Sequence, residues 1–304
     1  MKFINTLSAR ALVSTCAFLC ITASGALFAH EHDKTKPIQS QKLSDSIYFL
    51  SGKGGNLGVS IGEDGTFLID DKFAPLSDAI LTAIKEAGGD VPKFVVNTHF
   101  HGDHTGGNEN FGKQGSIIVA HDSVRKRLSE DNFIAAFNFS FPAQPKIGLP
   151  VVTFAEAITF YLNGDKIDVI HIPNGHTDGD SVIHFTKANV LHTGDLFFNG
   201  FYPFIDTDHG GSLVGLMAGI ESLLALTDDK TIIIPGHGPV ASKQDLVSYS
   251  AMLESANQKL SELKTQGLSV EEAIALNPLA SLDKEWADGM FTSNTWIGLI
   301  YKSL

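Results

Sequence analysis

A run of metal-ligating side chains near residue 100 constrains this chain more than any other feature. His99, His101, Asp103 and His104 lie within six residues of the segment THFHGDHTGG. The segment directly follows the apolar run 94–96, which predicts a short buried strand. The four side chains are therefore expected at the end of a strand, where a rigid base can present them while the backbone turns away.

Further candidate ligands occupy the same kind of place elsewhere in the chain. His176 lies in NGHTDGD, Asp195 in LHTGDLFF and His237 in IIPGHGP, each after an apolar run and beside glycine. Asp70 ends another such run, FLID. Because strand ends beside glycine can aim side chains at one point, we expect these sites to converge.

The remaining pattern predicts a layered α/β sandwich. Short apolar runs predict strands at 46–50, 57–61, 66–70, 94–96, 117–119, 151–154, 158–162, 166–172, 182–186, 189–193 and 231–234. Longer periodic stretches predict helices near 76–87, 122–130, 212–226, 243–265 and 291–303. Residues 131–150 carry four Phe without a clear period. We interpret them as a loop over the surface, either a lid or the cover of a satellite hydrophobic cluster.

This constellation resembles the metallo-β-lactamase superfamily from about residue 44 to the terminal helix. The resemblance implies a four-layer αββα sandwich with the site at one edge of two facing sheets. It implies a first metal held by His99, His101 and His176, a second held by Asp103, His104 and His237, and a bridging ligand, Asp195. Asp70 is implied to support the histidine loop from behind the ligands.

The implied chemistry is hydrolysis by a dinuclear zinc centre. Imidazole and carboxylate ligands suit Zn²⁺, and two ions that share a water can turn it into hydroxide near neutral pH. Asp103 is the catalytic candidate, because it would orient that water or take its proton. The expected substrate is a small molecule with an ester, thioester, lactone or amide bond.

Three alternatives remain open at this stage. A β-lactamase fits the family, but many members of that class have a cysteine where Asp195 stands, or lack a bridging ligand. A mononuclear iron persulfide dioxygenase would share the motif that begins at His99. A non-catalytic accessory or metal-buffering factor would keep the site for structure alone. The di-iron flavoproteins of the family place a glutamate where this chain has His101, which favours zinc.

The first 29 residues predict a secretory signal peptide, and hence a periplasmic or secreted protein. Lys2 and Arg10 precede an uncharged apolar stretch that ends in small residues. An uncleaved membrane anchor is the competing interpretation. After cleavage we expect no stable membrane association, a flexible terminus at 30–43 and one domain at 44–304. The two cysteines, Cys16 and Cys20, both lie in the signal, so the mature protein would have no disulfide.

Charge and the remaining residues restrict the partners. The net charge is −12, or −14 without the signal, and an acidic protein repels nucleic acid. His209 is a weak candidate for substrate binding, and a surface position is at least as plausible. We interpret His121, His184 and His192 as structural histidines. Apolar residues at helical spacing between 246 and 263 predict packing on the domain, with a homodimer seam as the alternative.

Overall fold

The computed structural model describes residues 37–304. The predicted signal peptide and the first residues of the predicted flexible terminus lie outside the described residues. Within residues 37–304, no helix combines the length and the apolar character that a membrane crossing would require.

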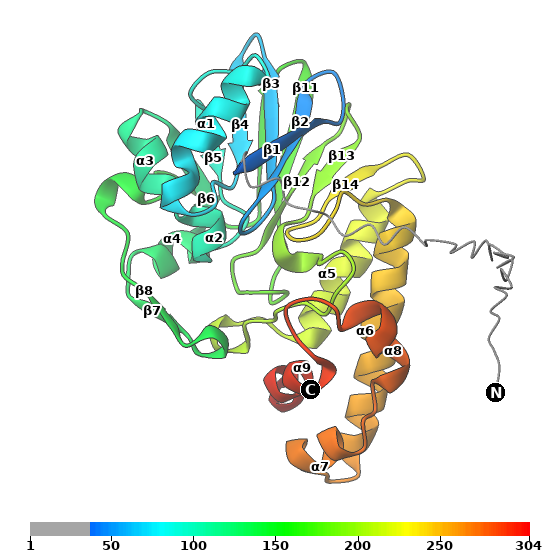
Figure 1. Ribbon diagram of the computed structural model, residues 1–304. Helices are drawn as coiled ribbons and strands as arrows, with labels where there is room; N and C mark the ends of the chain where they lie inside the picture. Colours follow the sequence, from blue (N-terminus) through cyan, green and yellow to red (C-terminus); the bar gives the residue numbers. More distant parts are fainter. Residues whose placement is uncertain (1–36) are drawn as a thin grey trace, which may run out of the picture. The chain divides into compact units, whose positions relative to one another are not determined.

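A seven-stranded sheet forms the first half of the sandwich (Figure 1). Its strands, in spatial order, are β1 (Ile38–Lys42), β2 (Ile47–Gly52), β3 (Leu57–Gly62), β4 (Gly65–Ile69), β5 (Phe94–Val96), β6 (Ile117–His121) and β9 (Val152–Phe154). The first four strands pair antiparallel, and β4, β5, β6 and β9 pair parallel. The β3–β4 hairpin turns tightly because Gly65 adopts a φ of +107° that most residues avoid.

A five-stranded sheet forms the second half. Its strands, in spatial order, are β10 (Ala157–Leu162), β11 (Asp165–His171), β12 (Ser181–Phe185), β13 (Val190–His192) and β14 (Ile232–Ile234). The first four pair antiparallel, whereas β13 and β14 pair parallel. The carboxyl ends of β13 and β14 therefore lie at the same edge of this sheet.

Helices cover the outer faces of both sheets (Figure 1). The first sheet is covered by α1 (Ser77–Glu86), α3 (Asn108–Lys113) and α4 (Asp122–Leu128), with the single turn α2 (Gly102–Thr105) at its edge. The second is covered by α5 (Leu213–Leu226) and α6 (Lys243–Thr265). The chain ends in α7 (Val270–Ala275), α8 (Ala280–Trp286) and α9 (Ser293–Ile300).

Three apolar clusters hold the layers together. The central cluster lies between the sheets and joins residues such as Phe67 and Val96 to Val169 and Phe185. A second cluster packs α1 and α3 on the first sheet, and the largest packs α5–α9 on the second sheet and extends to Val124 and Leu128 of α4. The arrangement is the four-layer αββα sandwich that the sequence predicts.

The helix α6 begins with a capping box, in which Ser242 and Asp245 each satisfy the other's backbone N–H. Its predicted apolar stripe is buried in the domain, as Tyr249, Leu253 and Leu260 show. These residues pack on α5 and the terminal helices, so the stripe is not free to form a dimer seam.

Two expectations about irregular segments need correction. Residues 38–42, part of the predicted flexible terminus 30–43, form strand β1 and pair with β2. Residues 131–150 are not a structureless loop, because they contain the hairpin β7 (Asn132–Ile134) and β8 (Phe139–Phe141). Backbone pairing decided both cases, because none of the three strands has an alternating apolar pattern long enough to be recognised in the sequence.

Candidate metal centre

The ends of the parallel strands bring the predicted ligands together. Asp70 follows β4, the histidine motif follows β5, and Asp195 and His237 follow β13 and β14. His176 enters from the loop between β11 and β12. All seven predicted metal ligands fall in two groups whose ligand atoms lie within 4.8 Å of one another: His99, His101, His176 and Asp195, and Asp103, His104 and His237.

The first group is a compact ring of buried nitrogen and oxygen atoms. His101 Nδ1 lies 3.1 Å from His99 Nε2 and 2.9 Å from His176 Nε2. Asp195 Oδ2 lies 3.8 Å from His99 Nε2 and 3.5 Å from His176 Nε2. All four residues are at most 6% exposed.

The hydrogen bonds behind these rings determine which nitrogens carry protons. His176 Nδ1 donates to the Phe204 carbonyl at 2.8 Å, so its Nε2 faces the group with a lone pair. Thr98 Oγ1 donates to Asp70, so it accepts from His99 Nδ1, and His99 Nε2 also presents a lone pair.

These lone pairs make the group a good fit for a cation. A proton on His101 Nδ1 could satisfy only one of its two neighbouring Nε2 atoms. One cation can satisfy all three nitrogens and the Asp195 carboxylate together, and this donor set suits Zn²⁺. Burial also lowers the pKa of His176 to about 4 and that of His99 well below its usual value, which keeps both imidazoles neutral.

The second group has the same character. His237 Nε2 lies 3.3 Å from Asp103 Oδ2, and His104 Nε2 lies 3.1 Å from Asp195 Oδ1. Neither His104 Nε2 nor Asp195 Oδ1 has a hydrogen-bond partner, although both are buried. Orphaned buried polar atoms are costly, and a second cation would satisfy both.

Asp195 stands between the two groups. One carboxylate oxygen faces His99 and His176, and the other faces His104. Burial alone would raise the pKa of Asp195, but the surrounding imidazoles lower it well below its usual value. Burial likewise opposes protonation of His237, yet the carboxylates of Asp195 and Asp103 raise its pKa to about 9. Asp195 therefore stays ionised, and a cation could take the place of the proton that the two carboxylates hold on His237.

Asp70 organises the histidine loop from behind. Its Oδ1 accepts from the Thr98 backbone N–H at 2.7 Å, and its Oδ2 accepts from His104 Nδ1 at 2.7 Å. The second bond leaves His104 Nε2 free to face the second group. Asp70 has a φ of +58°, a conformation that Asp tolerates better than most residues.

The sequence did not reveal the role of Asp206. This residue orients a histidine of the first group, as Asp70 orients His104 of the second. The carboxylate Oδ2 of Asp206 accepts from His101 Nε2 at 2.9 Å, which leaves Nδ1 free to face the group. Asp206 also accepts from His209 Nδ1 at 2.8 Å. Its position in the polar segment DTDHGG gave no signal beyond that of an ordinary turn.

The structure places His209 beside Asp206. Its side chain is buried, and it does not line the cavity above the two groups. The Asp206 carboxylate holds the ring inward, where it packs at 5.1 Å from the ring of Phe100. His209 therefore supports Asp206 and is not a surface residue, and its predicted contact with substrate stays a prediction.

Two further residues that the sequence did not single out fix the loop 54–56 against the site. Asn56 Nδ2 donates to the carbonyls of Pro235 and Gly238, on both sides of His237. Lys72 is fully buried and donates to the Gly55 carbonyl. Burial lowers the pKa of Lys72 to about 8, although nearby Asp103 and Asp70 oppose the shift.

The three histidines interpreted as structural lie outside both groups. His192 is buried and hydrogen-bonded to the Asn56 carbonyl and the Gly194 N–H. His121 stacks on His171 with ring centroids 3.7 Å apart, and it bonds the Ala155 carbonyl. His184 lies half-buried on β12.

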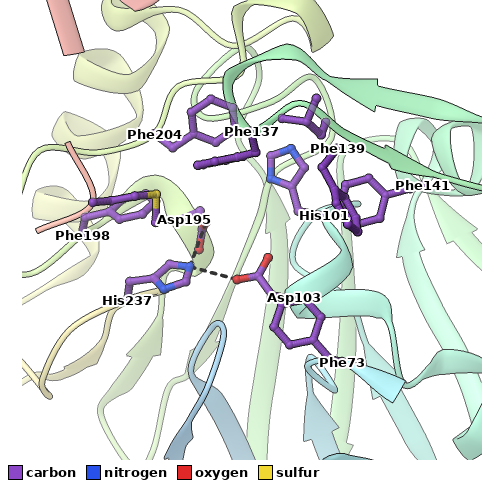
Figure 2. A pocket seen from close by; sticks show the side chains of 12 residues that line it. Phe73, His101, Asp103, Phe137, Phe139, Phe141, Asp195, Phe198, Phe204 and His237 are labelled. Carbon is purple, nitrogen blue, oxygen red and sulfur yellow. Dashed lines mark ion pairs between the residues drawn. The ribbon is translucent and has the colours of Figure 1, made fainter. Parts of the chain in front are cut away.

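A cavity of about 260 Å³ opens above the two groups (Figure 2). Its base contains His101, Asp103, Asp195 and His237, and its walls are apolar. Figure 2 shows the phenyl rings around this base and the ion pairs of His237 with the two carboxylates. A small molecule in the cavity would thus contact both predicted metal positions.

Comparison with known proteins agrees with this geometry. The family model described as the metallo-beta-lactamase superfamily matches residues 54–237, which contain both groups. A hydroxyacylglutathione hydrolase of Nitrosococcus oceani is 28% identical over 195 residues, which are 63% of this chain and 64% of that protein. The chain thus spans slightly less than two thirds of that relative.

A second curated relative, with a longer alignment, and one solved structure are also similar to this chain. The acyl-coenzyme A thioesterase MBLAC2 of Gallus gallus is 24% identical over 212 residues, which are 62% of this chain and 74% of that protein. The metallo-beta-lactamase from Pontibacter korlensis superposes with a TM-score of 0.57 at 22% identity, over 71% of this chain and 99% of that one. At that identity the structural likeness speaks for the fold alone.

Proposed function

The chain belongs to the metallo-beta-lactamase superfamily and is a metal-dependent hydrolase, and from this premise we propose that it uses two zinc ions to hydrolyse an ester, thioester, lactone or amide bond in a small molecule. One observation carries the proposal. The imidazole nitrogens of the first group face one another with lone pairs, and the second group has orphaned buried atoms beside the same carboxylate. Two relatives named as a thioesterase and as a hydroxyacylglutathione hydrolase support an acyl compound as the substrate.

The proposed metal sites use the residues on the page. His99, His101 and His176 would hold the first ion, Asp103, His104 and His237 the second, and Asp195 both. Zinc bound there would lower the pKa of a shared water from 15.7 towards about 7 and polarise a substrate carbonyl. The apolar walls would exclude bulk water, which strengthens every electrostatic interaction at the base.

Asp103 is the proposed catalytic residue. Its side chain is 23% exposed and lies at the base of the cavity, 3.3 Å from His237 Nε2. It can accept a proton as the water oxygen bonds to the carbonyl carbon. The bond from that carbon to oxygen, sulfur or nitrogen then breaks, and the same proton passes to the leaving group.

Metal analysis and a turnover screen test the proposal together. The chain is purified without added metal, its zinc and iron are measured, and it is assayed with esters, thioesters, lactones and β-lactams. We expect two zinc ions per chain and turnover of at least one acyl class, with kcat lowered about 100-fold or more in Asp103→Ala. One iron per chain with oxygen consumption on a persulfide would contradict the proposal. Equal activity in the variant would remove Asp103 from the mechanism.

Export is part of the proposal, and its support is the sequence of residues 1–29. We expect a bacterial host to yield a mature chain that begins near residue 30 in the periplasmic fraction or the medium. N-terminal sequencing of the fractionated protein decides between this and a retained anchor, which would leave the full chain in the membrane fraction.

A further inference from the structure

The walls of the cavity above the metal centre are almost entirely hydrocarbon. Eight of its twelve lining residues are Phe, Ile or Met, and the other four are the metal-group residues at its base. None of the lysines or arginines between residues 37 and 304 lines it. Exposed Lys53 lies outside this wall, with its Nζ 5.9 Å from the ring centroid of Phe73.

Half of the apolar wall comes from the β7–β8 hairpin. Ile134, Phe137, Phe139 and Phe141 line the cavity, and Ile134 pairs with Phe139 across the hairpin. Figure 2 shows the three phenyl rings of this segment on the two sides of His101, with Asp103 below them. Phe133 belongs to the same hairpin but does not line the cavity, although it is as exposed as Phe139, at 50%.

Phe141 fixes the hairpin on the ligand motif. A Cβ atom added to Gly102 would lie 2.1 Å from Phe141 Cε1, so the ring rests on the backbone between His101 and Asp103. Phe141 also packs against Phe139, with ring centroids 4.5 Å apart at 72°. The hairpin therefore places a pair of phenyl rings beside His101 and Asp103 at the base of the cavity.

These two rings also separate the cavity from a second one. The second cavity measures about 340 Å³ and extends under the hairpin towards residues 142–145. Phe73, Phe139 and Phe141 line both cavities. Phe139 and Phe141 thus act as a partition, and its removal would lengthen the space available to a substrate.

We propose that the substrate carries an uncharged, apolar acyl group that fills the first cavity, and that Phe139 limits its length. This inference rests on the proposed hydrolase function. Each buried methylene raises affinity about fourfold, whereas a carboxylate or phosphate against these walls would lose its water without gaining a cation. The cavity volume lies just below the range for drug-sized ligands, which suits an acyl group of medium length.

The test compares acyl groups on one leaving group. Zinc-loaded full chain is assayed with p-nitrophenyl acetate, hexanoate and dodecanoate, and with the mono-p-nitrophenyl ester of adipic acid, which adds a carboxylate to the hexanoate. We expect kcat/KM for hexanoate to exceed that for acetate and for the adipate ester by at least about tenfold each. Equal or better turnover of the adipate ester would overturn the inference. If Lys53→Gln then abolished the preference for the adipate ester, the Lys53 ammonium would be the group that binds the substrate carboxylate.

Two variants on the hairpin test the partition. Phe139→Ala should raise the ratio of dodecanoate to hexanoate turnover by at least about tenfold, because the two cavities join. Phe133→Ala is the matched control, since it removes an equally exposed ring that faces away, and its ratio should equal that of the wild type. The same ratio in both variants would overturn the role of Phe139.

A binding measurement separates this inference from the proposed function. Calorimetry with hexanohydroxamic acid and with the monohydroxamic acid of adipic acid needs no turnover. Tighter binding of the alkyl compound by at least about tenfold, with no ester hydrolysed, would support the apolar site and reject the hydrolase. Equal binding of the two compounds, with esters hydrolysed, would reject the apolar site and keep the hydrolase.

Discussion

The Nε2 atom of His101 lies 2.9 Å from the Oδ2 atom of Asp206, although 105 positions separate the two residues. This contact joins the ligand motif of the first sheet to the long loop after β13. It sets the tautomer of His101, because a ring that donates from Nε2 presents the lone pair of Nδ1.

Replacement of Asp206 should weaken the first metal site. Asp206→Ala removes the acceptor, so we expect zinc affinity to fall about 10- to 100-fold. Asp206→Asn can still accept through its carbonyl oxygen, so its loss should be smaller. Competition with a chromophoric chelator measures both, and exposed Asp208→Asn in the same loop is the control. Unchanged affinity in Asp206→Ala would show that the contact does not orient the ligand.

Asp70→Asn should impair the second site while the first is kept. Asn tolerates the positive φ of position 70, so the backbone is expected to survive. If its Oδ1 still accepts from the Thr98 N–H, the amide NH₂ would face His104 Nδ1 and force the proton onto Nε2. Titration with Co²⁺ should then show one tight site where the wild type shows two. Two tight sites in the variant would contradict this reasoning.

Asn56→Ala should loosen the loop that carries His237. The variant leaves the carbonyls of Pro235 and Gly238 without their donor, at a cost of about 2–3 kcal/mol in the free energy of unfolding. Urea denaturation measures the change. Asn199→Ala is the control, because it removes one exposed bond to the neighbouring Pro239 carbonyl and should cost well under ~1 kcal/mol. Equal costs would show that burial of the Asn56 contacts contributes nothing.

His192 should make the metal-free protein less stable in mild acid. Burial lowers its pKa to about 4, whereas the unfolded chain takes up the proton near 6.5. Between these values the unfolded state binds more protons, so stability falls as the pH falls through this window. From pH 7 to pH 5 the loss due to this residue is about 2 kcal/mol.

Denaturation at pH 7 and pH 5 in the presence of EDTA, for the wild type and His192→Asn, measures that loss. Between pH 7 and pH 5 the free energy of unfolding should fall by about 2 kcal/mol less in the variant than in the wild type, because Asn has no titrating proton. The difference between the two proteins cancels the titration of other groups. An identical change in both proteins would show that His192 does not contribute.

The layers and the ligand set could be predicted because strong, local signals specify them. Apolar runs such as 94–96 can be buried only as strands of this length, and Asp195 and His237 stand directly after two of them. The parallel pairing of β13 with β14 then brings those ends together. Their convergence thus follows from strand order, which only the structure shows, whereas the resemblance to a known family implied a common site at one edge of the two sheets.

The parts that could not be predicted depend on distant contacts or on very short elements. The turn α2 has four residues, too few for a helical period to be visible, and it exists because the motif wraps around the site. The burial of Lys72 depends on the Gly55 carbonyl and on the carboxylates of Asp103 and Asp70, and of these only Asp70 is close to it in sequence. The three-residue strands of β7 and β8 carry no alternation that could be distinguished from a loop.

The two metal groups draw on both sheets, and this has a consequence for how the chain matures. The first group lacks a member until Asp195 has been synthesised, and the second until His237 has left the ribosome. A nascent chain that has only its first sheet holds the histidine motif without the partners that complete either group. Capture of the proposed ions would therefore come late in folding, and their uptake would mark the moment at which the two halves have closed on each other.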